Sequence, residues 1–89
     1  MENKNEELEA LRKQIDEIDE QLAMLLKQRF SVAKQIGEYK KTNGIVVTDS
    51  GRESAVYEHI GGLFDDDLQK NEAKKVYMQI IASSKELQK

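Results

Sequence analysis

Residues 8–40 read LEALRKQIDEIDEQLAMLLKQRFSVAKQIGEYK, and their apolar side chains follow one line along a helix. Leucine or isoleucine recurs at alternating steps of three and four residues, at positions 8, 11, 15, 18, 22 and 25. This spacing is typical of a single apolar helical face. It predicts a long helix from about Asn5 to Lys41, which the turn-forming residues Thr42-Asn43-Gly44 would end.

Two basic residues interrupt the apolar face of this helix. At about 100° per residue, Arg29 and Lys40 both project close to the middle of the apolar stripe. A cation on a buried face is costly unless an anion meets it there. The stretch therefore requires either a buried acidic side chain or an anionic ligand. Gly37, inside the same helix, allows the close approach of another backbone or of a ligand, and the sequence leaves both open.

The predicted helix is too long for a domain of this size. At about 1.5 Å per residue it would measure roughly 55 Å, whereas a compact chain of 89 residues is about 30 Å across. Its far end needs cover from another chain, so we expect an intertwined homodimer. A long isolated hairpin is the alternative.

Composition excludes several classes of site and partner. The 89 residues, taken as a single domain over 1–89, contain no cysteine and one histidine, His59, so we expect no metal site and no cofactor. A net charge of −3 argues against nucleic-acid binding, which usually needs a basic face. The polar start MENKNEELEA contains no apolar run, which argues against a signal peptide or membrane span and favours a cytoplasmic protein.

Two shorter helices follow, which makes the expected fold all-α with three helices per chain. Thr48-Asp49-Ser50 can cap a helix over about 49–61, with Val56, Ile60 and Leu63 on its buried face. A third helix over about 66–88 begins with Asp66 and Gln69 at capping-box spacing. The acidic run at 65–67 is therefore interpreted as capping and not as a metal site.

Polar residues also lie on the inward faces of the shorter helices, among them Asp49, Arg52, Glu53, Ser84 and Gln88. With the two cations of the long helix they form a largely basic set. Such a set suits a small polyanion that carries hydroxyl or ether oxygens, because arginine binds carboxylates through two parallel hydrogen bonds. No activated nucleophile is evident, so a reaction that needs only positioning and charge stabilisation fits best.

The same residues carry a family resemblance. Over essentially its whole length the chain resembles the all-helical class of chorismate mutases, on motifs in this order: Leu11-Arg12-x-x-Ile15-Asp16-x-x-Asp19, Gln28-Arg29, Ile36-Gly37-x-x-Lys40, Asp49-x-x-Arg52-Glu53 and Gln79-Ile80-Ile81-x-x-Ser84-x-x-x-Gln88. The resemblance implies an intertwined dimer with two active sites, each completed by the partner's long helix. It also implies conversion of chorismate to prephenate by an intramolecular Claisen rearrangement, in phenylalanine and tyrosine biosynthesis.

The resemblance also implies roles for single residues in substrate binding. Arg12, supplied by the partner chain, would bind one substrate carboxylate together with Arg29. Arg52 and Ser84 would help to hold the other carboxylate.

For the reacting part of the substrate, the resemblance implies that Lys40 lies near a carboxylate and the ether oxygen, with Gln88 on the other side of that oxygen. Glu53, with Asp49 nearby, would take the ring hydroxyl. Arg29, Lys40, Gln88 and Glu53 are thus the expected catalytic residues.

Two other functions compete with this interpretation. An isochorismate pyruvate-lyase is similar in fold and shares many of the basic site residues, although Glu53, placed for the ring hydroxyl of chorismate, favours the mutase. A non-enzymatic helical dimerisation module would instead pair Arg29 and Lys40 with acidic residues of the partner chain.

Overall fold

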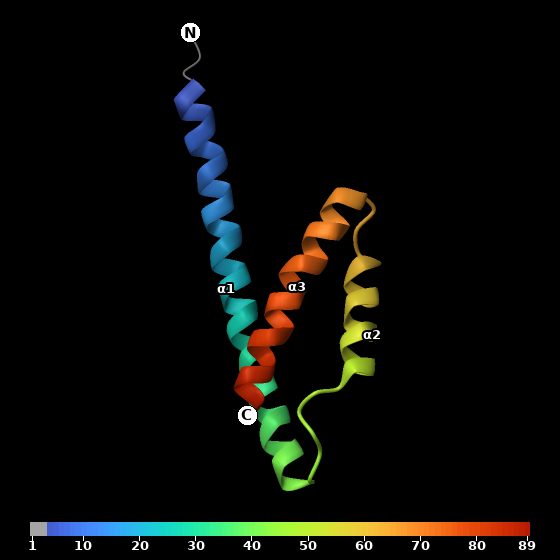
Figure 1. The fold of residues 1–89 in the computed structure, drawn as a ribbon. Helices are drawn as coiled ribbons and strands as arrows, with labels where there is room; N and C mark the ends of the chain where they lie inside the picture. Colours follow the sequence, from blue (N-terminus) through green and yellow to red (C-terminus); the bar gives the residue numbers. More distant parts are fainter. Residues whose placement is uncertain (1–3) are drawn as a thin grey trace.

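The computed structural model describes residues 4–89, and three α-helices account for most of them (Figure 1). They are α1 (Lys4–Thr42), α2 (Ser50–Gly61) and α3 (Asp67–Gln88). No strand occurs in this range. The all-α prediction is confirmed, and each helix begins and ends within one residue of its expected bounds.

The end of α1 follows from local backbone chemistry. The backbone N–H of Asn43 still donates to the carbonyl of Tyr39 at 3.0 Å, and Ile45 donates to Lys40 at 2.8 Å. Between them Gly44 adopts a φ of 65°, a left-handed conformation that glycine takes without steric cost. The predicted stop therefore satisfies the last carbonyls of the helix and turns the chain back toward α2.

Aspartate side chains cap the other two helices. Asp49 accepts a hydrogen bond from the backbone N–H of Arg52 at 3.0 Å, and Asp66 accepts one from Gln69 at 2.9 Å. Each bond satisfies an N–H group that has no partner within its helix. No group of three His, Cys, Asp or Glu residues within the described chain could hold a metal ion.

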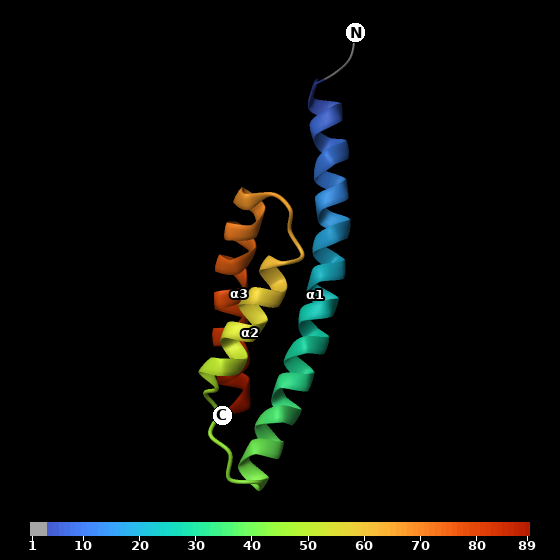
Figure 2. The same cartoon turned by 90° about the vertical axis from the view of Figure 1, so that its right-hand side faces the viewer.

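The three helices give an elongated molecule. Figures 1 and 2 show α3 packed against the C-terminal part of α1 and α2 packed against α3, while the N-terminal part of α1 extends past them. The extents are 66 × 26 × 15 Å and the radius of gyration is 17.6 Å, against about 12 Å for a compact chain of this length. Within residues 4–89 no helix is both long and apolar enough to cross a bilayer.

The chain alone covers few of its apolar side chains. Among residues 4–89, the buried hydrophobic residues are Ala33 and Ile81, and the six apolar side chains of the α1 stripe between positions 8 and 25 are each 44–60% exposed. Leu63, which we expected on the buried face of α2, is 65% exposed. That expectation was wrong because α2 ends at Gly61, so Leu63 lies in the following turn and no longer follows the helical period.

Candidate active site

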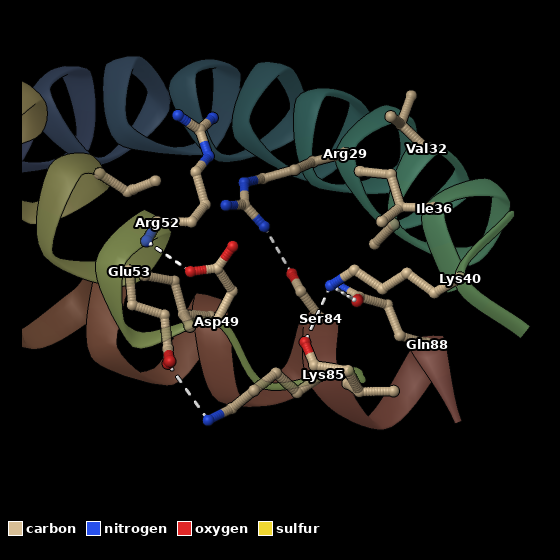
Figure 3. A pocket seen from close by; sticks show the side chains of 14 residues that line it. Arg29, Val32, Ile36, Lys40, Asp49, Arg52, Glu53, Ser84, Lys85 and Gln88 are labelled. Carbon is tan, nitrogen blue, oxygen red and sulfur yellow. Dashed lines mark hydrogen bonds and ion pairs between the residues drawn. The ribbon is translucent and has the colours of Figure 1, made fainter. Parts of the chain in front are cut away.

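A pocket of about 290 Å³ lies between the C-terminal part of α1, the start of α2 and the end of α3. This volume is near the lower end of small-molecule sites. Part of its wall is apolar, formed by residues that include Val32 and Ile36 of α1 and Ile81 of α3. The polar side chains of the wall come from all three helices and from the N-cap of α2: Arg29, Lys40, Asp49, Arg52, Glu53, Ser84, Lys85 and Gln88 (Figure 3).

The charge around the pocket is opposite in sign to that of the whole chain. Four basic side chains and two carboxylates line it, which leaves an excess of two positive charges, whereas the chain carries −3. A concave surface with one dominant sign of charge concentrates ligands of the opposite sign. The pocket therefore suits a small molecule with two negative charges.

Arg29 is held in place by neutral groups. Its Nη1 donates to the hydroxyl of Ser84, and its guanidinium lies 5.9 Å from the ring centre of Tyr77. Ser84 is buried, and its hydroxyl donates in turn to the backbone carbonyl of Ile80 at 2.8 Å. Because the guanidinium has five N–H donors, this arrangement orients Arg29 and leaves donors for a carboxylate.

Lys40 and Gln88 form the second polar contact between α1 and α3. The ammonium of Lys40 donates to Oε1 of Gln88 at 2.9 Å and to the backbone carbonyl of Val47 at 2.8 Å. Lysine can only donate, so the amide oxygen of Gln88 must face it. The amide nitrogen of Gln88 has no hydrogen-bond acceptor in residues 4–89, and it carries two N–H donors for a ligand.

The start of α2 supplies the third cation. Arg52 extends from α2 toward α1 (Figure 3), and its guanidinium forms no ion pair with any acid of the described chain. One oxygen of Asp49, on the same wall, accepts from the backbone of α2. None of the three pocket cations Arg29, Lys40 and Arg52 is therefore neutralised by an ion pair to an acid in residues 4–89.

Lys85 lines the pocket and was missing from the sequence-based prediction. Its ammonium lies 3.1 Å from Oε1 of Glu53, and both side chains are largely covered. The signal was present in the spacing, since Ile81, Ser84, Lys85 and Gln88 lie at steps of three and four along one face of α3. The pair holds the Glu53 carboxylate at the edge of the pocket.

Arg12 is the one predicted site residue that lies away from the pocket. It belongs to the extending N-terminal part of α1, where its guanidinium contacts Glu9 at 2.7 Å and remains exposed. The structure thus brings together seven of the eight predicted residues, while their individual roles stay predictions.

Comparison with known proteins agrees with the character of this pocket. A family described as chorismate mutase type II matches residues 11–89. A chorismate mutase of Methanocaldococcus jannaschii is 36% identical over 85 residues, which cover 94% of this chain and 86% of that protein. A bifunctional chorismate mutase/prephenate dehydratase of Aquifex aeolicus is 35% identical over 94% of this chain, but the match spans only 24% of that longer protein.

A solved structure has a similar fold. A conserved hypothetical protein from Pyrococcus furiosus superposes with a TM-score of 0.79 at 34% identity, and the match covers 92% of this chain and 95% of that one. The arrangement of three helices is therefore shared by a protein of nearly the same length.

Proposed function

The chain belongs to the chorismate mutase type II family, and on that premise we infer that its pocket rearranges chorismate to prephenate. The protein is a chorismate mutase, an isomerase of aromatic amino-acid biosynthesis. The observation that carries the assignment of the site is the excess of two positive charges around a pocket whose wall is partly apolar. The substrate is a dicarboxylate with an apolar ring face, and it complements both properties.

The reaction breaks a carbon–oxygen bond and forms a carbon–carbon bond within one molecule, without a covalent intermediate. The protein can accelerate it in two ways. It can hold the flexible substrate in the compact conformer in which the two carbons meet. It can also place donors where negative charge grows on the ether oxygen.

Arg29 and Arg52 bind the substrate carboxylates in this proposal. They line one pocket from different helices, so a dicarboxylate that bridges them is held at both ends. Ser84 supports this clamp because its hydroxyl orients the guanidinium of Arg29. The compact conformer is favoured because its two carboxylates meet two cations, one of which, Arg29, is oriented by Ser84.

Lys40 and Gln88 stabilise the transition state. Lys40 donates to the amide oxygen of Gln88, which keeps the amide N–H groups of Gln88 available to the ether oxygen. The ammonium retains a further N–H for the same oxygen or the adjacent carboxylate. A pair of donors placed before the reaction requires no reorganisation when charge develops.

Glu53 accepts a hydrogen bond from the ring hydroxyl of the substrate. Lys85, 3.1 Å from one of its carboxylate oxygens, restrains the side chain and leaves the second oxygen free to accept. An isochorismate pyruvate-lyase acts on a ring whose hydroxyl is placed differently, so this contact favours the mutase. Parallel assays with chorismate and isochorismate test the choice: we expect prephenate from chorismate and no pyruvate release from isochorismate, and the reverse would exclude it.

We further propose that the active unit is an intertwined homodimer in which Arg12 of one chain enters the pocket of the other. Two observations support it: the extending half of α1 presents an uncovered apolar stripe, and Arg12 lies on that half, away from the pocket of its own chain. Large exposed apolar patches are typical of protein interfaces. Pairing two such stripes would cover both of them.

Mixing two inactive variants tests the shared site. Arg12→Ala and Arg29→Ala should each abolish activity, because each removes a carboxylate ligand from both pockets of its dimer. Unfolding and refolding them together at equal concentration forms mixed dimers with one intact pocket, so about a quarter of the wild-type activity should return. No recovery, with mixed dimers shown by mass spectrometry, would exclude Arg12 from the partner's site.

A further inference from the structure

Gly37 lies where the backbone of α1 packs closely against the backbone of α3. A methyl group built on its Cα would lie 2.5 Å from the Cα of Gln88, 2.5 Å from its carbonyl oxygen and 2.8 Å from its carbonyl carbon. All three are backbone atoms, which no side-chain rotation can move away. The structure therefore decides the question that the sequence left open: Gly37 admits another backbone, that of Gln88.

This contact lies at a sensitive point of α3. Gln88 is the last residue of the helix, where the carbonyl groups lack partners within the helix and the end is prone to fraying. The position of Gln88 therefore depends strongly on what it packs against. Its backbone packs on Gly37, and its side chain accepts from Lys40, one helical turn further along α1. Gly37 and Lys40 together hold Gln88 from the same face of α1.

We propose that Gly37 is a positioning residue for the reaction, because the absence of its side chain sets how deeply Gln88 enters the pocket. The proposal rests on the role of Gln88 proposed above. A side chain at position 37 would push the end of α3 off α1. The Gln88 amide would then lose the Lys40 contact and its place at the pocket wall. Arg29 and Arg52 would keep their places at the wall.

The structural part of the proposal is tested by thermal unfolding of Gly37→Ala in two backgrounds. In the full chain we expect Tm to fall, because the new methyl overlaps the Gln88 backbone. In a chain from which residues 88–89 are deleted, the overlapping atoms are gone and alanine is the better helix former, so the same substitution should raise Tm. Gly62→Ala is the control in both backgrounds, since its methyl would meet nothing closer than 3.5 Å, and it should change Tm little.

A change of Tm with the same sign in both backgrounds would overturn the proposal, as would an unchanged Tm in the full chain. These Tm measurements do not depend on catalysis. They therefore test the contact between Gly37 and Gln88 separately from the catalytic role proposed for Gln88. If Gly37→Ala prevents folding of the full chain, the rise in Tm in the shortened chain still tests the contact.

The catalytic part is tested by a double-mutant cycle. We expect Gly37→Ala to lower kcat by at least tenfold and to change KM less than threefold. Gln88→Ala should lower kcat by a similar or larger factor, and the double variant should fall no further, because both changes remove the same donor. Factors that multiply would show that Gly37 acts independently of Gln88 and would overturn the proposal. A Gln88→Ala variant with normal kcat would instead refute the proposed role of Gln88.

Discussion

Lys40 and Ser84 both form hydrogen bonds within the pocket, yet they should contribute unequally to the rate. The Lys40 ammonium faces the position proposed for the ether oxygen, where charge develops. The Ser84 hydroxyl is occupied by Arg29 and by the carbonyl of Ile80, so it acts on the substrate mainly by orienting Arg29. The contact of Lys40 with the ether oxygen strengthens in the transition state, whereas Ser84 supports binding of the substrate through Arg29.

We therefore predict that Lys40→Ala lowers kcat by a factor of hundreds, in line with about 3–4 kcal/mol for one preorganised donor. Ser84→Ala should cost about 1.5 kcal/mol, that is roughly tenfold, the lower end for a hydrogen bond to a charged group. Steady-state kinetics with chorismate measures both. The exposed neighbour Lys41→Ala serves as a control and should behave like the wild type, and equal losses for Lys40 and Ser84 would contradict this division of roles.

The Gln88 amide leads to a prediction about pH. An amide donates a hydrogen bond in any protonation state of its surroundings, whereas the carboxyl introduced by Gln88→Glu donates only when it is protonated. The ammonium of Lys40, which lies 2.9 Å from the amide oxygen, would favour the ionised carboxylate. The activity of the variant should thus be lost as pH rises and recovered as pH falls, so its optimum shifts to acid.

A profile of kcat against pH, measured for the wild type and for Gln88→Glu, tests this expected shift of the optimum. The comparison with Gln88→Ala, which has neither donor, shows whether the recovery at low pH comes from the introduced acid. If the profile of Gln88→Glu coincides with that of the wild type, Gln88 does not face the ether oxygen.

At the scale of elements, the helices combine local signals with tertiary contacts. The caps at Asp49 and Asp66 are local, because each uses a backbone N–H three residues away. The two caps differ in what else they touch: Asp49 lies on the pocket wall, whereas Asp66 starts α3 at the end remote from the pocket. Stability and activity can therefore be separated at Asp66.

We predict that Asp66→Ala lowers the free energy of unfolding by about 1 kcal/mol, the usual cost of losing an N-cap side chain. It should leave kcat unchanged, since α3 contributes to the pocket through its other end. Chemical denaturation and steady-state kinetics measure the two quantities. Asp65→Ala, next to the cap, is the matched control and should change stability little. If Asp65→Ala loses as much stability as Asp66→Ala, negative charge near the start of α3, and not the cap, stabilises this helix.

At the scale of the whole molecule, the main feature is the uncovered face of α1. An isolated chain with a radius of gyration of 17.6 Å and two buried hydrophobic residues among those described has little core to offset the entropy lost on folding. The proposed dimer would supply that core. In that case the stability of the fold depends on protein concentration, and Tm should rise as the protein is concentrated.

Ile18→Lys tests the same face directly. In the single chain Ile18 is 49% exposed, and a substitution at such a surface position would change stability by no more than about 0.5 kcal/mol. In the dimer the lysine would enter the interface, so we expect dissociation, loss of helicity and loss of activity. Sedimentation and circular dichroism measure the outcome against Glu17→Lys, an exposed neighbour; a stable, active Ile18→Lys protein would exclude this face from the interface.

The sequence by itself determined the features that depend on neighbours along the chain. The three helices, their caps and the turn at Gly44 follow from hydrophobic spacing and from side chains within four residues of the bond they make. The placement of Arg29 and Lys40 on an apolar face follows from the helical period. These signals were sufficient to predict that seven residues lie together in one pocket, because residues on the inward faces of packed helices must converge.

Only the tertiary structure decided how the helices cross. The contact of Gly37 with the Gln88 backbone and the pair formed by Lys85 and Glu53 depend on the depth and rotation of α3 against its neighbours. Helical spacing states which side a residue lies on, but it carries no information about the distance to another helix. That distance is set by side-chain volumes at the crossing, and at Gly37 it is the missing side chain that sets it.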